Sequence, residues 1–235
     1  MTRIRLALLG LVLAVPHALL AQTTTIVEVW PELDIHYWTS SALRTVLESS
    51  LSTEQERTNR EATVGLFEDY MKLPGGYLRA GFRYTFSTTD ESYRESRALG
   101  DVVLRVFGTE RMRLVNRTRG ELRWVNGEYS YRLRDRLHLQ RLARDSTGRA
   151  WAPYGTVEVY YDSRFAGIPR IGGRVGTEVR LRGARFDVYV AHQHDTRPER
   201  VNVFALGITT RLTYGSRRVQ GPRRENPARA VRTSR

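Results

Sequence analysis

The stretch RTRGELRWVNGEYSYRLRDRL, residues 117–137, has the pattern of two long β-strands joined by a tight turn. Asn126 and Gly127 at its centre form the pair that best tolerates the positive φ angles of a type I′ turn. If Val125 pairs with Glu128 across this turn, the partner of every other position in the two strands is fixed. The stretch therefore predicts a β-hairpin of defined register.

This register separates an apolar face of the hairpin from a charged face. On the apolar face, Trp124 lies opposite Tyr129 and Leu122 lies opposite Tyr131. The charged face is a ladder of arginines with one glutamate, which pairs Glu121 with Arg132, Arg119 with Arg134 and Arg117 with Arg136. Each strand is roughly a dozen residues long, about twice the usual length in a soluble sheet.

Apolar and polar residues alternate along most of the remaining chain, as expected for strands with one buried and one solvated face. In residues 170–182, for example, Arg174, Glu178 and Arg180 share one phase. The clear runs are 27–38, 77–86, 156–162, 170–182, 185–195 and 202–214, and weaker runs are 43–55, 60–72 and 94–107. No segment has a convincing helical period, so the sequence predicts an all-β protein.

Together with the hairpin these runs give about eleven strands. A closed bacterial barrel with both chain ends in the periplasm needs an even number of strands. We therefore expect an antiparallel up-and-down transmembrane β-barrel of about 12 strands, with 10 as the next expectation.

Alternation alone does not separate a membrane barrel from a soluble sheet, because both have one apolar face. Strand length and aromatic residues favour the membrane barrel, since aromatic side chains form girdles at membrane interfaces. The aromatic residues near predicted strand ends are Trp30, Trp38, Trp124, Tyr129, Trp151, Tyr154 and Tyr214. The last run ends on Tyr214, as is typical of the C-terminal strand that barrel-assembly machinery recognises. A soluble periplasmic β-barrel that binds a small apolar ligand is the alternative.

Residues 1–21 have the pattern of a secretory signal peptide. Arg3 and Arg5 precede an apolar run over residues 6–15, and Pro16 ends that run. Because a spanning helix needs about 20 apolar residues, this run is too short for one. The sequence therefore predicts export through the periplasm to the bacterial outer membrane. It contains no cysteine, which excludes disulfides and a lipid-bearing cysteine after the signal.

The net charge of +13 is unevenly distributed along the chain. Residues 215–235 contain seven arginines and one glutamate, and the predicted signal peptide adds two arginines. Most of the excess thus lies outside residues 22–214, the predicted barrel, and argues against a nucleic-acid-binding domain. We expect residues 215–235 to form a disordered arginine-rich tail, and outer-membrane lipid and barrel-assembly machinery to be the partners.

The segments VNRTRGELRW and YSYRLRDRL, followed by VEVYYD and GGRVGTEVRL, resemble the bacterial outer-membrane barrel family catalogued as domain of unknown function 2490. The most specific part is the ladder Asn116, Arg117, Arg119, Glu121 and Arg123. The resemblance covers most of residues 22–214 and departs from the family at the tail and in the N-terminal third. It implies an outer-membrane barrel and supplies no reaction.

In a barrel the charged ladder lines the lumen. The predicted lumen-facing network comprises Arg117, Arg119, Glu121, Arg123, Arg132, Arg134, Glu158, Glu178, Arg180 and Asp187. One interpretation is a surface that selects or binds anions, and the other is a salt-bridged plug in a narrow pore. The plug is favoured. Arginine opposite arginine, as at Arg119 and Arg134, is unfavourable without acids. Glu121, Glu158, Glu178 and Asp187 are therefore the expected interior partners of the arginines.

The motif HQHD at 192–195 is the one candidate for catalytic or metal chemistry. His192 and His194 share a strand face, but a metal site needs a third ligand that the sequence does not identify. Ser163 or Thr209 could serve a lipid-modifying hydrolase, yet nothing ties either to His192. We therefore predict a protein without enzymatic activity and without catalytic, cofactor or metal sites, and keep the membrane-embedded hydrolase as an alternative.

Asp135 does not fit the pattern of the hairpin. The register directs it outward, opposite Thr118. A carboxylate on the lipid-facing side of a barrel is unfavourable. The sequence offers no explanation for this residue.

Overall fold

The computed structural model describes residues 24–54, 60–89, 93–144, 150–181, 183–197 and 200–215. The predicted signal peptide, and the predicted tail apart from Gly215, lie outside these ranges. The strands are β1 (Thr24–Trp38), β2 (Leu43–Glu54), β3 (Arg60–Tyr70), β4 (Gly76–Ser87), β5 (Arg94–Gly108), β6 (Met112–Val125), β7 (Glu128–Arg141), β8 (Ala143–Arg144), β9 (Ala150–Asp162), β10 (Gly167–Leu181), β11 (Ala184–Asp195) and β12 (Val201–Tyr214).

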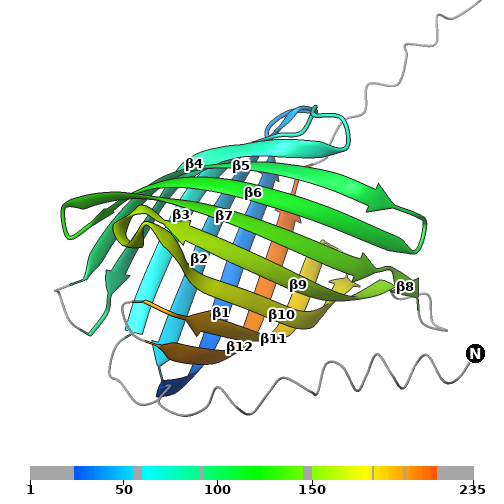
Figure 1. Ribbon diagram of the computed structural model, residues 1–235. Coiled ribbons are helices and arrows are strands. Elements are labelled where there is room, and N and C mark those ends of the chain that lie inside the picture. Colours follow the sequence, from blue (N-terminus) through cyan, green and yellow to red (C-terminus); the bar gives the residue numbers. More distant parts are fainter. Residues whose placement is uncertain are drawn as a thin grey trace, which may run out of the picture.

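The strands form a closed barrel (Figure 1). Long strands that follow each other along the chain pair antiparallel. The short strand β8, of two residues, pairs only with the edge of β9, so β7 pairs directly with β9, and β9 pairs with β10 on its other side. Closure comes from β1 and β12, which pair in parallel from Thr24 opposite Val201 to Tyr37 opposite Tyr214. Eleven long strands therefore surround the lumen.

The structure confirms the predicted all-β closed barrel, but the expected count of twelve or ten strands and the expected wholly antiparallel pairing are wrong. The even-number rule assumes that every neighbouring pair is antiparallel, including the pair that closes the barrel. In this chain β1 and β12 run in the same direction, and a parallel pair closes an odd number of strands. The eleven runs visible in the sequence correspond to the eleven long strands.

The hairpin of β6 and β7 has the predicted register. Val125 lies opposite Glu128, and Trp124 lies opposite Tyr129 with ring centroids 5.7 Å apart. The turn residues Asn126 and Gly127 have φ angles of 50° and 91°. We call the barrel end that carries this turn the hairpin end.

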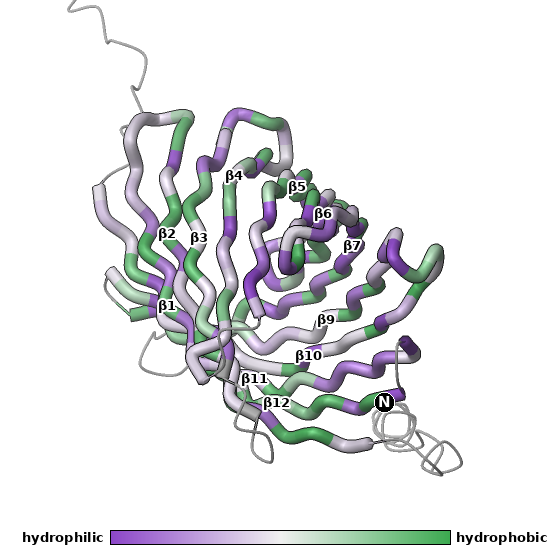
Figure 2. Tube along the Cα trace, turned by 90° about the vertical axis from the view of Figure 1, so that its left-hand side faces the viewer, coloured by the Kyte–Doolittle hydropathy of each residue, from purple (hydrophilic) through white to green (hydrophobic). Residues whose placement is uncertain are grey.

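The barrel has an apolar exterior and a polar interior. Hydrophilic and hydrophobic residues alternate along the strands, as the hydropathy colouring in Figure 2 shows. The burial of alternate residues shows that charged and polar side chains point inward and apolar side chains point outward. Among the described residues, 16 polar or charged side chains are buried but only 11 hydrophobic ones, and 36 large hydrophobic side chains are exposed. This polarity is the reverse of a water-soluble domain, in which large apolar side chains are mostly buried.

The only helix in the described ranges is a three-residue 3₁₀ turn, η2 (Ser163–Phe165), between β9 and β10. Within those ranges, no helix has the length and apolar character needed to cross a membrane.

Candidate functional site

The ladder residues line the lumen, together with acids from strands outside the hairpin. Arg119, Glu121 and Arg123 on β6 are each at most 3 % exposed. Arg132 and Arg134 on β7 point to the same side, as the alternation of burial along β7 shows. The structure therefore places the charged face of the hairpin in the interior of the barrel.

Glu158 on β9 accepts five hydrogen bonds, from three arginines and one tyrosine. Its Oε1 accepts from Arg117 Nη2 at 3.0 Å and Arg134 Nε at 3.2 Å. Its Oε2 accepts from Arg134 Nη2 at 3.2 Å, Arg136 Nη2 at 2.7 Å and the Tyr160 hydroxyl at 2.7 Å. Three guanidinium groups thus share one negative charge, although Arg134 also donates to Glu121 at 3.0 Å.

Three acids that the sequence analysis did not assign to the lumen complete the ion pairs of β6. Arg123 donates to Glu95 on β5 and, at 2.8 Å, to Asp162 on β9. Arg119 binds Asp101 on β5 with two hydrogen bonds of 2.6 and 2.8 Å. The phase of β5 and β9 predicts that these acids face inward, but only closure of the barrel identifies their arginine partners.

These contacts join into one connected group of ion pairs, which we call the charge network. Its members are Arg97, Arg117, Arg119, Arg123, Arg132, Arg134, Arg136 and Arg164 with Glu95, Asp101, Glu121, Glu158 and Asp162. Eight arginines face five carboxylates, so the network carries three more positive than negative charges. An arginine side chain stays protonated at neutral pH, so loss of a proton does not relieve this excess.

The remaining predicted lumen residues lie outside the charge network. Glu178 accepts from Arg180 at 2.8 Å and lies 3.7 Å from Arg211, near the end opposite the hairpin end. Asp187 was expected to pair with arginine, and this expectation is wrong. Its described hydrogen bond comes from the Tyr154 hydroxyl at 2.9 Å, because Tyr154 reaches it across β10.

At the rim of the hairpin end, the pKa values of Tyr93, which lies beside the network, and of the network member Arg164 are raised. Burial raises the pKa of the Tyr93 hydroxyl, and its hydrogen bond to Glu95 at 2.6 Å adds to the effect. Hydrogen bonding to Asp162 raises the pKa of Arg164 on η2. Both shifts keep the rim groups in the protonated forms that donate to the network.

Aromatic rings lie over glycines on the inner wall and narrow the lumen. Tyr189 on β11 pairs with Gly176 on one side and Gly207 on the other. A Cβ at Gly176 would lie 2.6 Å from Tyr189 Cβ, and a Cβ at Gly207 would overlap the Tyr189 ring. The Phe67 ring occupies an equivalent place, 2.6 Å from a Cβ built on Gly65.

Two aromatics expected near the membrane interfaces belong to this interior group. Tyr154, Tyr189, Ala191 and Ala205 form a buried cluster, and Trp30 packs against it. Trp30 shares the inward phase of β1 with the acids Glu28 and Glu32. The placement of Trp30 and Tyr154 at an interface is therefore wrong, and the phase of their strands already indicated the lumen.

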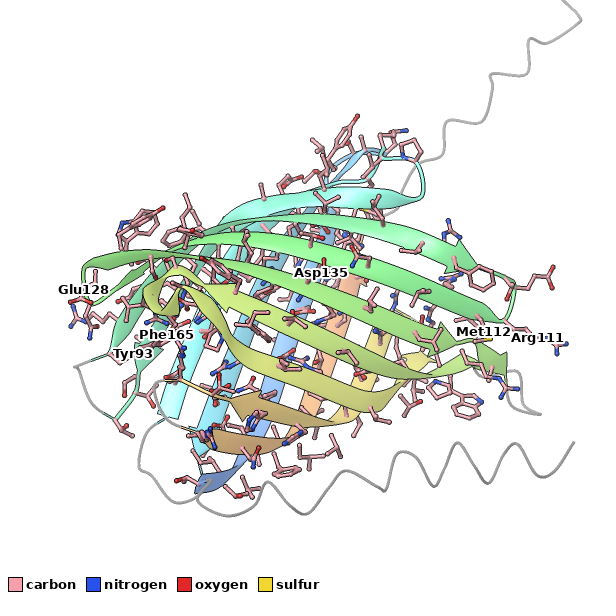
Figure 3. All side chains as sticks on the ribbon, viewed as in Figure 1. Tyr93, Arg111, Met112, Glu128, Asp135 and Phe165 are labelled. Atoms are coloured by element: carbon pink, nitrogen blue, oxygen red, sulfur yellow. The ribbon has the colours of Figure 1, made fainter. Side chains whose placement is uncertain are left out.

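The outward position of Asp135 is confirmed, and two neighbours satisfy its carboxylate. Asn116 Nδ2 donates to Oδ1 at 2.9 Å, and the Thr118 hydroxyl donates to Oδ2 at 2.7 Å. Figure 3 places Asp135 between the end that carries Glu128 and the end that carries Arg111. Asp135, Asn116 and Thr118 thus form a hydrogen-bonded polar triad on an otherwise apolar stretch of the outer wall.

The histidine motif gives no converging chemistry. His192 and His194 lie on the outer face and share Asn202 Oδ1 as a partner, at 3.3 and 2.9 Å. Thr209 faces the lumen and donates to Glu32 at 2.9 Å, while Ser163 lies at η2 and accepts from the Tyr131 amide at 2.9 Å. Within the described ranges, no three His, Cys, Asp or Glu side chains are grouped as metal ligands.

An apolar groove crosses the outer wall beside His192. It has a volume of about 620 Å³, and Gly155 and Gly173 lie among its apolar lining with Leu137, Val157 and Phe204. The two glycines lower the surface between the larger side chains, so the groove follows from their missing Cβ atoms.

Comparison with family models, with curated proteins and with solved structures finds no match for this chain. The resemblance to domain of unknown function 2490 therefore stays a prediction.

Proposed function

We propose that the chain is a bacterial outer-membrane β-barrel whose lumen is closed by side chains, so that it acts without an open solute pore. The observation that carries this proposal is the reversed polarity of the barrel. Monomeric soluble proteins rarely expose contiguous apolar patches above a few hundred Å². Here the exposed hydrophobic side chains come from all eleven long strands.

Aromatic residues at the two ends of the outer wall support a membrane position. Trp124, Tyr129 and Tyr131 lie near the hairpin end, and Tyr131 lies 6.1 Å from Tyr161 between ring centroids. At the opposite end, Tyr37 pairs with Tyr214. Two aromatic girdles that flank an apolar band are typical of outer-membrane barrels.

Three features of the lumen support a closed state. The charge network joins β5, β6, β7, β9 and η2 through ion pairs, and the aromatic cluster around Tyr189 occupies the wall formed by β9, β11 and β12. On the third side, Arg79 and Arg83 both lie over the Phe67 ring, at 5.2 and 5.7 Å from its centroid. A barrel filled in this way is held rigid by its interior and presents its outer wall to partners.

The predicted signal peptide and the aromatic end of β12 support export and assembly by barrel-assembly machinery, with outer-membrane lipid around the wall. In that setting, the groove beside Gly155 and Gly173 would be filled by lipid chains. A soluble barrel for a small apolar ligand is less well supported, because the described interior is charged. A hydrolase is also less well supported, because Thr209 and His192 lie on opposite faces of the wall.

Two measurements on the full chain test the proposal. After membrane fractionation, the protein is expected with outer membranes and with faster gel migration when unheated. In planar bilayers, it is expected to give no steady conductance steps. Recovery as a soluble protein without detergent would overturn the membrane location, and a steady open conductance would overturn the closed lumen.

A further inference from the structure

A small polar cavity lies in the lumen wall beside the charge network. It has a volume of about 10 Å³ and is lined by Thr156, Glu158, Gly172, Arg174 and Gln193, among others. Gly172 explains why it exists. Gly172 lies between Glu158 on β9 and Gln193 on β11 in the strand register, so no side chain fills the space between them.

Arg174 is the unusual member of this lining. Its guanidinium lies 4.8 Å from the Tyr189 ring centroid and 5.6 Å from that of Trp30. Among the described residues, no hydrogen-bond acceptor and no carboxylate within ion-pair distance binds it. Glu32 accepts from the Tyr189 hydroxyl at 3.3 Å, on the ring that Arg174 covers. Arg174 is thus a fixed cation without a bound anion partner.

The other charged side chain of the lining, Glu158, is outnumbered by the arginines that bind it. Glu158 belongs to the lining, but its charge is shared by Arg117, Arg134 and Arg136. The Nε atoms of Arg117 and Arg136 are buried and have no hydrogen-bond partner. Three arginines that share this one carboxylate therefore stand behind Glu158, and the unpaired Arg174 shares the cavity lining with it. Buried charge of one sign is strongly unfavourable unless a counter-charge lies close.

We propose that this cavity binds one halide-sized anion, such as chloride or bromide. The guanidinium of Arg174, the hydroxyl of Thr156 and the amide of Gln193 are donors of the kind that hold an anion. The volume has room for about one water-sized particle, which excludes phosphate, sulfate and organic anions. The inference rests on the closed lumen of the proposed function, since an open pore would neutralise these charges with mobile ions.

The experiment uses the full chain in detergent, with bromide as the probe and gluconate at equal ionic strength as the reference. Because an ion that binds only the folded state stabilises it, saturating bromide is expected to raise Tm by about 5 °C above the gluconate value. Crystals soaked in sodium bromide are expected to show an anomalous peak beside Gly172. Equal Tm values in the two salts together with no anomalous peak would overturn the proposal.

Two variants test the site by independent routes. Arg174→Gln removes the cation, and Gly172→Ala keeps every charge but fills the cavity. A Cβ at Gly172 would lie 3.6 Å from His192 O and 3.9 Å from Gln193 Cγ, which are ordinary contacts, so this variant is expected to fold. Both variants should lose the bromide-specific shift and the anomalous peak.

Gly155→Ala is the matched control, because its Cβ faces outward and meets only Arg174 O at 4.0 Å. It should keep the full bromide shift. A shift that persists in Gly172→Ala would place the ion elsewhere and overturn the site. Failure of the membrane proposal would instead appear in fractionation, which does not depend on the salt used.

Discussion

Tyr189 and Gly207 are direct cross-strand partners, and the ring of the tyrosine covers the position that a Cβ of the glycine would take. The ring can lie against the wall only because this position is a glycine. Gly176 has the same relationship to Tyr189 from the other side. The aromatic cluster that narrows the lumen thus depends on glycines in neighbouring strands.

Gly207→Ala is expected to lower the free energy of unfolding by about 1–3 kcal/mol, because overpacking displaces the Tyr189 ring. Urea unfolding in detergent measures the change, with Gly155→Ala as the control that should alter it little. In a Tyr189→Ala background, Gly207→Ala should add no further loss. A loss that persists there would show that the glycine serves the backbone and not the ring.

Glu158→Gln and Arg117→Gln should have very different effects, although the two side chains bind each other. Glu158→Gln removes the negative charge that three guanidinium groups share. Breaking a buried ion pair in this way lowers the free energy of unfolding by about 3–5 kcal/mol. Removing Arg117 leaves Glu158 with Arg134 and Arg136 and lowers the excess charge of the network. Arg117→Gln is therefore expected to be close to neutral in urea unfolding. Equal losses of stability in the two variants would mean that the excess of arginine over acid does not affect the free energy of unfolding.

The polar triad on the outer wall predicts a coupled pair of substitutions. Thr118→Val removes the donor to Asp135 Oδ2 and is expected to cost about 1–3 kcal/mol in lipid vesicles, because it leaves a desolvated carboxylate oxygen unsatisfied. In an Asp135→Leu background, the same substitution should be neutral. Folding titrations in vesicles, followed by gel migration, provide the four stabilities. Additive effects would mean that this part of the wall faces water.

The local part of the fold could be predicted from sequence, and the closing contacts could not. Asn126 and Gly127 fix a turn, and the turn fixes every pair of β6 and β7, so the hairpin was predictable in full. The strand number was predicted wrongly because closure joins Thr24 to Val201, residues at opposite ends of the chain. No local pattern indicates whether such a pair is parallel.

In the lumen, too, the direction of a side chain could be predicted from sequence, but its partners on other strands could not. Strand phase was sufficient to predict that Glu121 and Glu158 face inward with the arginine ladder. The partners of Arg123 could not be predicted, because Glu95 and Asp162 reach it from β5 and β9 across the interior. An excess of arginine over acid becomes visible only when the contacts are joined into one network. Asp187 differs because its Oδ2 accepts from the Tyr154 hydroxyl, and phase alone does not distinguish a hydroxyl partner from a guanidinium.

The parallel pairing of β1 and β12 also has a consequence for sidedness. In a barrel with an even number of strands, the first residue of the first strand and the last residue of the final strand emerge in the same compartment. Here Thr24 and Tyr214 lie at opposite mouths of the barrel, because the two strands run together along their whole length. In an intact outer membrane, a membrane-impermeant reagent added from outside would reach a label at one of these residues and never at the other.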